Sequence, residues 1–270
     1  MSAGVLYLVP TPLGSEDDPL RVLPRETIER LAALDYLIAE NARSARAVLG
    51  RVPLQRPLQS IEIRELNHRT DPQELPGLLA PIAAGRDGAL LSEAGCPAVA
   101  DPGAALVALA HAQGIRVAPL IGPSAILLAL MASGMNGQRF AFAGYVPVVD
   151  DDRVQRLREL EQRSADGDET QLLIETPYRN QALFDAMLRT LSPTTSVTIA
   201  SDLSLPGERI ETRSVADWRQ RRPQLPRTPT VFALHAVPSA RPPRAREAAS
   251  RRMPRTAPGA EPTARRRAHR

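Results

Sequence analysis

The sequence predicts an α/β protein with two α/β domains, and two observations carry this prediction. Short β-branched or leucine-rich runs alternate with longer stretches of helical periodicity along the first 240 residues, which is typical of a mainly parallel sheet. The chain has 270 residues and is 43% hydrophobic, which is enough to bury one large core or two smaller ones.

The first half alternates strands and helices in a regular order. Strands are expected at residues 4–10, 36–40, 59–63, 88–92 and 116–121, and helices at 25–34, 42–49, 73–84, 103–113 and 124–133. Pro102 and Pro123 stand just before helix starts, and Gly114 and Gly134 stand just after helix ends. Proline tolerates the first helical turn and glycine the left-handed residue that ends a helix.

A second α/β set follows. This set comes after a strand expected at 139–146. Its own strands are expected at 171–175, 196–201, 208–212 and 230–235, and its helices at 150–163, 180–191 and 216–222. The segment around Pro147 reads as a short linker, so the expected domains are an N-terminal one at 1–146 and a C-terminal one at 147–237. A cleft between two such domains is a natural place for a small-molecule cofactor.

Charged residues exclude several chemistries. All 34 basic residues are arginine, so the chain has no lysine for a Schiff base, a phosphate-binding loop or a kinase-type ATP site. The single cysteine, Cys96, excludes a disulfide framework, and the four histidines are scattered without metal-ligand spacing. No metal site is expected.

The C-terminal stretch 238–270 differs from the rest of the chain. Its last thirty residues hold ten arginines against Glu247 and Glu261, a net charge of +8, whereas the preceding 240 residues carry −4. Such an Arg/Pro-rich composition predicts a disordered basic tail, either a solvated extension or a weak nucleic-acid contact. The start of the chain does not resemble a signal peptide and no run of eighteen apolar residues occurs, so we expect a cytoplasmic protein with no membrane partner.

Gly/Pro-rich loops follow four of the predicted strands. They read PTPLGS (10–15), SEAGCPAVADPG (92–103), IGPSA (121–125) and ETPYR (175–179). Open α/β sheets bind ligands at the carboxyl ends of their strands. Glycine and proline in any one of these loops could simply end a strand. The four loops in this order and at this spacing are a much more specific signal of a ligand site.

Together with AENAR (39–43), these loops resemble the tetrapyrrole (corrin/porphyrin) methylase family and, within it, the branch of small-subunit ribosomal RNA 2′-O-methyltransferases I. The corresponding stretches of that branch read approximately PTPIGN, AEDTR, SDAGTPxISDPG, PGPSA and ESPHR. The likeness covers roughly residues 4–236. It implies two domains with S-adenosylmethionine (SAM) folded into the cleft between them, and a homodimer.

The resemblance also implies which residues contact the cofactor. Small residues at these positions let the main chain approach a ligand closely. The implied set comes from all four loops: Pro10, Leu13, Gly14, Ser92, Glu93, Ala94, Gly95, Cys96, Ala98, Val99, Asp101, Gly122, Pro123, Ser124, Ala125, Thr176, Pro177 and Tyr178.

Several of these residues have a second interpretation. Asp101 would serve equally well as a helix cap, and Cys96, which replaces a threonine of the branch, suits packing better than nucleophilic attack. Glu40, at a strand end with Arg43 nearby, is the first candidate for a catalytic base and its partner, although an ordinary surface acid and arginine fit as well. Glu175 is the alternative base. His68 lies near a histidine-containing segment of the branch but aligns poorly with it.

Methyl transfer to a ribosomal RNA (cytidine-2′-O-) position is therefore the expected activity, with ribosomal RNA or the small ribosomal subunit as partner. Two alternatives remain: a methyltransferase acting on a tetrapyrrole or another small molecule, and a SAM-binding paralogue without catalysis. Tyr178 stands where the branch has histidine, and the segment 202–208 lacks the branch's lysine. These departures concern the acceptor more than the cofactor.

Overall fold

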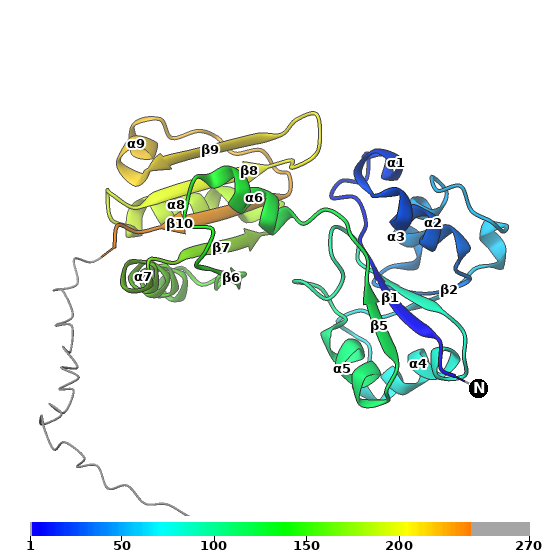
Figure 1. Cartoon of the computed structure of the whole chain (residues 1–270). Coiled ribbons are helices and arrows are strands. Elements are labelled where there is room, and N and C mark those ends of the chain that lie inside the picture. The colour runs from blue at the N-terminus through cyan, green and yellow to red at the C-terminus, as the bar shows by residue number, and fades with distance from the viewer. Residues whose placement is uncertain (1, 239–270) are drawn as a thin grey trace, which may run out of the picture. The chain divides into compact units, whose positions relative to one another are not determined.

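The computed structural model describes residues 2–238, which form one compact unit containing two five-stranded sheets (Figure 1). The predicted tail, apart from Pro238, lies outside the described residues. Both sheets carry interleaved helices, so the predicted α/β class is confirmed. No helix in the described part combines the length and apolar character needed to cross a bilayer.

The first sheet is entirely parallel, with the strand order β3-β2-β4-β1-β5. Its strands are β1 (Val5–Val9), β2 (Tyr36–Ala39), β3 (Glu62–Glu65), β4 (Gly88–Leu91) and β5 (Arg116–Pro119). The helices that connect them are α1 (Pro19–Val22), α2 (Arg25–Ala33), α3 (Ala42–Leu49), α4 (Leu75–Ala83) and α5 (Ala104–Ala112).

Both faces of this sheet are covered, because successive residues of a strand point to opposite faces. Leu37 of β2 packs with α2 and α3 in one core cluster, and Ile38 packs with α4 and α5 in another. Strands buried on both sides read as continuous apolar runs, which is why 36–40 and 88–92 were recognisable in the sequence.

The second sheet is mixed, with the order β6-β7-β10-β8-β9. Its strands are β6 (Phe140–Gly144), β7 (Thr170–Glu175), β8 (Ser196–Ser201), β9 (Arg209–Ser214) and β10 (Thr230–His235). Only β6 and β7 pair in parallel, whereas β10 runs antiparallel to both β7 and β8.

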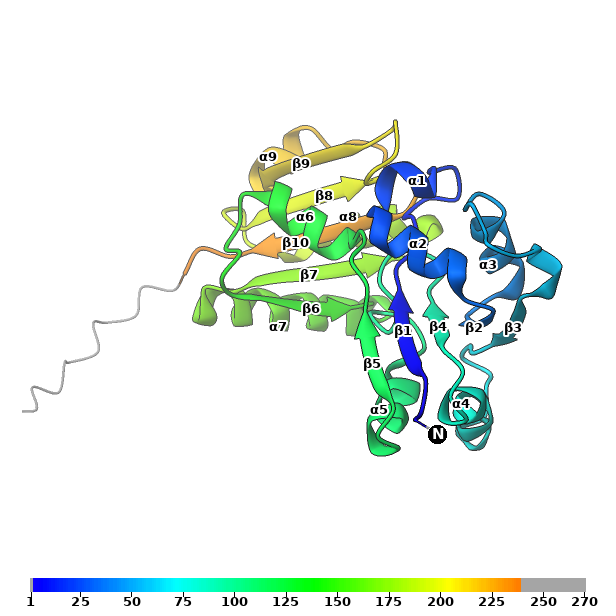
Figure 2. The same cartoon turned by 45° about the vertical axis from the view of Figure 1, so that its right-hand side comes forward.

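Helices cover both faces of the second sheet as well. Helices α7 (Asp150–Gly167), α8 (Asn180–Thr190) and α9 (Val215–Gln220) pack on one face around Phe184 and Trp218, whose rings meet edge to face at 5.4 Å. Helix α6 (Ala125–Ser133) packs on the other face through Ala129 and Leu130 (Figure 2).

The domain boundary expected near Pro147 does not fit this arrangement. Both α6 and β6 precede Pro147, yet both belong to the second sheet. We therefore propose that the boundary lies between β5 and α6, at about residues 120–124, rather than at 146. An apolar helix and a short apolar strand are compatible with either core, so their composition did not assign them.

Three local elements also differ from expectation. The strand expected at 59–63 begins as a 3₁₀ turn, Leu58–Ser60, and β3 follows at Glu62–Glu65. Helix α7 extends to Gly167, where Asp168 adopts the left-handed conformation that ends it. Short α1 was not predicted; Asp18 caps it and Pro19 opens it.

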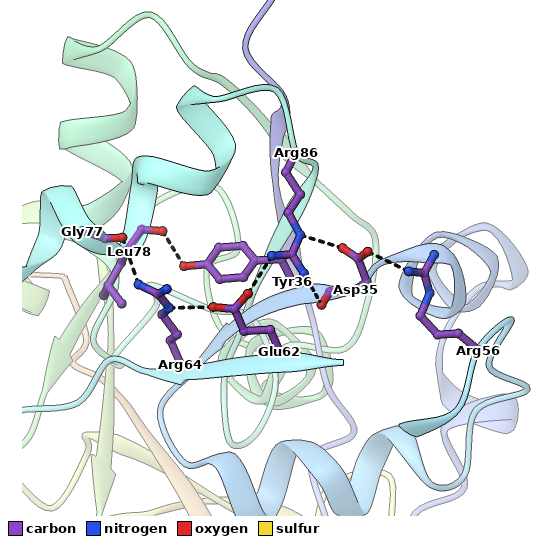
Figure 3. Close-up of polar contacts among 8 residues, drawn as sticks. All are labelled: Asp35, Tyr36, Arg56, Glu62, Arg64, Gly77, Leu78 and Arg86. Carbon is purple, nitrogen blue, oxygen red and sulfur yellow. Dashed lines mark hydrogen bonds and ion pairs between the residues drawn. The ribbon is translucent and has the colours of Figure 1, made fainter. Parts of the chain in front are cut away.

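A charged network ties the starts of β2, β3 and β4 together at the edge of the first sheet opposite the predicted loops (Figure 3). The Arg86 guanidinium donates to Asp35 Oδ1 at 2.8 Å and to Glu62 Oε2 at 2.6 Å. It also lies 5.0 Å from the ring centroid of Tyr36, whose hydroxyl donates to the Leu78 carbonyl. Hydrogen bonds from Arg86 lower the pKa of Asp35 and of Glu62, so both stay ionised and hold this edge in place.

Candidate functional site

A cavity of about 310 Å³ opens at the carboxyl ends of β4 and β7. Seven segments contribute to it: the loop after β1, the loop after β4, the first turn of α6, the residue after β6, the end of β7, the end of β8 with its following loop, and the start of β10. Its lining residues are Leu13, Ala94, Gly95, Cys96, Val99, Ala100, Asp101, Ser124, Ala125, Ile126, Tyr145, Ile174, Glu175, Thr176, Pro177, Ala200, Asp202, Leu203, Leu205, Pro229, Thr230 and Val231.

Buried hydrogen bonds fix the conformation of the loop after β4. The Ser92 hydroxyl donates to the Gly95 carbonyl at 2.7 Å. Thr11 and Gly95 exchange backbone hydrogen bonds of 2.9 and 3.1 Å, which fastens this loop to the one after β1. Ser92 therefore supports the pocket wall from behind, while Gly95 faces the cavity.

Backbone strain concentrates around the cavity. Among the described residues, the non-glycine residues with positive φ are Ala98, Ala100, Asp168, Asp202 and Ser204. All but Asp168 belong to the loop after β4 or the loop after β8, and both loops line the pocket. Positive φ costs non-glycine residues free energy and clusters at functional sites. The pocket walls thus present their main-chain groups in fixed, unusual directions.

The amino terminus of α6 faces the same cavity. Ser124 is its N-cap, and its hydroxyl accepts from the Leu127 amide at 3.5 Å, while Ala125 and Ile126 line the pocket. The first amides of a helix have no partner within the helix, and the helix dipole adds positive potential there. This end of the pocket therefore favours an anionic group.

Asp101 is a half-buried carboxyl group that lines the pocket. It makes no hydrogen bond with another described residue, and Gly103 is the N-cap of α5 with no side-chain cap, so the capping role considered from the sequence is absent. Burial, together with the negative charges of Glu40 and Glu93, raises the pKa of Asp101 to about 6. A carboxylate with this pKa exchanges a proton near neutral pH.

Glu40 stands beside this cavity without lining it. It follows β2 and precedes Asn41, the N-cap of α3, and its carboxylate lies 3.9 Å from His68 Nε2. Burial and the charge of Glu93 raise the pKa of Glu40, and His68 acts in the opposite direction. Glu40 therefore acts on Asp101 through its charge, and Glu93 is held nearby by a 2.9 Å hydrogen bond from the Ser44 hydroxyl.

Glu175, the alternative base, lines the pocket but already has strong partners. Its Oε1 accepts from Arg179 Nη2 at 2.5 Å and from the Thr176 amide at 2.7 Å. Its Oε1 is thus occupied by these partners, which leaves it less accessible to a hydroxyl of a bound substrate. Tyr145 also lines the pocket, and burial, reinforced by the charges of Asp101 and Glu175, raises the pKa of its hydroxyl, so this hydroxyl stays protonated.

Cys96 fits the packing interpretation. Its thiol lies 3.5 Å from the Pro123 carbonyl, and burial raises its pKa. A thiol with a raised pKa is a weak nucleophile at neutral pH.

The predicted site residues fall into three groups. Those that line the cavity are Leu13, Ala94, Gly95, Cys96, Val99, Asp101, Ser124, Ala125, Thr176 and Pro177. Gly14, Glu93 and Arg43 line a neighbouring hollow of about 350 Å³ with Pro12, Ser15, Ser44, Ala47, Val48 and Arg51. Those that line neither are Pro10, Glu40, Ser92, Ala98, Gly122, Pro123 and Tyr178.

Some pocket residues were not predicted. Ala200, Thr230 and Val231 come from β8 and β10, where a pocket wall and a core strand have the same composition. Tyr145, which follows β6, had no motif around it. The loop carrying Asp202, Leu203 and Leu205 gave a weak signal, because its Pro and Gly residues follow a strand end. No group of three or more His, Cys, Asp or Glu among residues 2–238 is arranged to hold a metal ion.

The fold and the cavity define an α/β protein of two sheets with a pocket of small-molecule size at the carboxyl ends of its strands. The family model of Tetrapyrrole (Corrin/Porphyrin) Methylases matches residues 5–218, and the chain belongs to this family. The chain is accordingly a SAM-dependent methyltransferase, and the resemblance seen in the sequence is confirmed.

Relatives in this family agree with that assignment. Ribosomal RNA small subunit methyltransferase I of Mesorhizobium japonicum is 36% identical over 216 residues, which cover 78% of this chain and 69% of the relative. The protein of the same name from Synechocystis is 35% identical over 201 residues, covering 74% and 67%. The solved structure of the methyltransferase CobJ has a TM-score of 0.57 at 19% identity, covering 87% of this chain and 95% of that one, so it shares the fold.

Proposed function

We propose that the 310 Å³ cavity binds SAM and that the chain methylates a ribose 2′-hydroxyl of small-subunit ribosomal RNA. The observation that carries this proposal is Asp101, a carboxyl group with a pKa of about 6 that lines the pocket. A ribose hydroxyl needs a base or strong orientation to become a nucleophile, whereas more acidic acceptors do not. The choice of RNA as the methyl acceptor is supported by the names of the relatives, which are ribosomal RNA small subunit methyltransferases.

The residues of the pocket fit this cofactor. Gly95, Ala94 and Ala125 leave room for close approach by the main chain. The free amides at the start of α6 suit the carboxylate of the methionine part, and the apolar wall from Ile174, Leu203 and Val231 suits an adenine ring. When bound, SAM supplies a methyl group on a positively charged sulfur.

The protein's own contribution is alignment, exclusion of water and removal of a proton. Asp101 accepts the proton of the attacking hydroxyl, and Glu40 and Glu93 keep the pKa of Asp101 near neutrality by their negative charge. The Arg43 amide donates to Asn41 Oδ1, but the Arg43 guanidinium makes no hydrogen bond or ion pair with another described residue, so it is available to a phosphate of the RNA. An enzyme with this substrate would act in the cytoplasm.

Filling the cavity should abolish cofactor binding. We expect Ala125→Trp to eliminate the heat of SAM binding in isothermal titration, because the indole would occupy the pocket next to the amides of α6. Ala112→Trp, at the exposed end of α5, is the matched control and should bind as the unaltered chain does. Equal SAM affinity in both variants, or no binding by the unaltered chain, would place the cofactor elsewhere.

We also propose that the chain is a homodimer, through the apolar surface formed by α6 and by Ile121 in the segment before it. Ile121, Leu127 and Met131 are exposed by 75%, 49% and 79%, and a helix that is apolar all round is normally buried. Sedimentation velocity should give twice the 29.3 kDa of one chain, and Met131→Asp should give single chains. Gln113→Asp, on the exposed end of α5, should leave the dimer intact. A single-chain mass for the unaltered protein would refute this assembly.

A further inference from the structure

Tyr178 is exposed at the rim of the pocket. Its side chain is 81% exposed, although the two preceding residues, Thr176 and Pro177, line the cavity. The chain has only one Trp, four Tyr and four Phe. Among the described residues, Tyr178 and Tyr145 are the aromatic residues exposed by more than half; Tyr145 lines this pocket, and Tyr178 directly follows the lining residue Pro177. An exposed ring beside a pocket offers a flat face on which a planar ligand group can stack.

An arginine accompanies this ring. The Cζ atom of Arg227 lies 5.9 Å from the centroid of the Tyr178 ring. Arg227 is exposed and has no carboxylate partner among the described residues. Its guanidinium therefore keeps its full charge for an incoming group, and most of the tyrosine ring remains open beside it.

Both halves of this pair are held in position. Tyr178 belongs to the 3₁₀ turn Pro177–Arg179, which is anchored by the bonds from Arg179 to Glu175. The segment that carries Arg227 is fastened to the start of α8, because Asn180 Nδ2 donates to the Thr228 carbonyl at 2.8 Å. Gln181 Oε1 likewise accepts from the Leu225 amide at 2.8 Å. The two backbone segments that carry these side chains are thus fastened to each other.

We propose that Tyr178 and Arg227 form a stacking platform for an unpaired base of the RNA substrate, next to the nucleotide that is methylated. Single-stranded RNA is recognised by stacking of its bases on aromatic rings and on arginine guanidinium planes. The platform lies on the rim of the pocket, so a base stacked on it brings the adjacent ribose toward Asp101. This inference rests on the proposed RNA methyltransferase function.

The platform assigns Tyr178 to the acceptor, whereas the sequence resemblance implied a contact with the cofactor. The two assignments differ in a measurable way. A cofactor contact would change the Kd for SAM, whereas a base platform would change the KM for RNA and leave the Kd for SAM unaltered.

The decisive experiment compares Tyr178→Ala, Tyr178→Phe and Arg227→Met in methylation of undermodified small ribosomal subunits, with SAM affinity measured in parallel. We expect Tyr178→Ala to raise the KM for RNA at least about fivefold, since loss of one stacked base has effects of this size or larger. Tyr178→Phe should retain the normal KM, and Arg227→Met should raise it. The Kd for SAM should stay the same in all three. Phe140→Ala, at the 41% exposed aromatic of β6, is the matched control and should change neither value.

An unchanged KM in Tyr178→Ala, or a Kd for SAM that rises with it, would overturn the platform. Fluorescence anisotropy with a single-stranded fragment of small-subunit RNA separates this result from failure of the proposed function. If the unaltered chain binds the fragment without methylating it and Tyr178→Ala weakens that binding, the stacking platform is supported and the proposed methylation of RNA is wrong. If the unaltered chain does not bind RNA, both proposals fall.

Discussion

Asp101→Asn should reduce methyl transfer at least about 100-fold, the usual range for loss of a general base, while SAM binds with nearly unchanged affinity. Asparagine has the same shape as the aspartate but cannot accept the proton. Asp101 has no hydrogen bond to lose with another described residue, so the substitution leaves the wall of the pocket intact. Single-turnover rates and isothermal titration measure the two effects separately.

The pH dependence provides a sharper test of the same residue. Only ionised Asp101 accepts a proton, and its pKa is raised to about 6, so the rate should rise as the pH increases through about 6 and level off above it. Glu40→Gln removes one of the charges that raise this pKa and should move the midpoint to lower pH. Asp202→Asn, on another wall of the pocket, should keep the normal midpoint, since asparagine tolerates the positive φ at that position.

Folding stability offers a control for the Asp101 variant. A carboxyl whose pKa is raised in the folded protein weakens folding as the pH rises through the interval between its unfolded and folded pKa values. Asp101→Asn removes this penalty and should therefore melt at a higher temperature than the unaltered chain at pH 8. Two results for Asp101→Asn would exclude Asp101 as the base. One is a methyl-transfer rate within a factor of about three of that of the unaltered chain; the other is a rate that still rises with pH through about 6 as it does in the unaltered chain.

Gly122→Ala should cost stability and cofactor affinity together. A Cβ atom at Gly122 would lie 2.3 Å from Pro10 Cβ and 2.8 Å from Pro10 Cγ, and a proline ring has no rotamer that moves it away. Pro10 follows β1 and Gly122 follows β5, and these strands are paired in the sheet. The added methyl must therefore push apart the start of α6 and the loop after β1, both of which line the pocket.

Overpacking of this kind typically costs about 1–3 kcal/mol. We expect a lower urea midpoint and at least a tenfold weaker Kd for SAM, a loss of about 1.4 kcal/mol. Gly77→Ala in α4 is the control: its Cβ would meet no atom within 4 Å, and alanine favours a helix over glycine by about 1 kcal/mol. Similar results for the two variants would show that the close approach of Gly122 to Pro10 has no role in shaping the pocket.

This pair also shows how far a motif predicts a site. Pro10 and Gly122 were expected to contact the cofactor, and they lie in loops that do line the pocket, but they pack on each other. Ser92 likewise holds the loop that carries Gly95. A motif identifies the loop that approaches the ligand; whether a given side chain lines the cavity or supports it from behind depends on main-chain geometry that the motif does not encode.

Composition alone predicted some elements of the fold and left others unassigned. The strands 36–40 and 88–92 were recognisable because burial on both faces makes them continuously apolar. The apolar helix α6 and the strand β6 could not be assigned to a sheet, since either core would accept them. The wall formed by Ala200, Thr230 and Val231 was not recognised because its residues resemble an ordinary core strand. The pKa of Asp101 depends on Glu40 and Glu93, which only the folded chain brings near it.

The most direct test is to incubate the protein with SAM labelled in its methyl group and small ribosomal subunits from a strain that lacks this gene. The RNA is then digested to nucleosides, and a uroporphyrinogen fraction is treated in parallel. The proposed function predicts label in a 2′-O-methylated nucleoside of small-subunit RNA, and none with Asp101→Asn. Label in the tetrapyrrole fraction instead, or in neither fraction despite SAM binding, would contradict it.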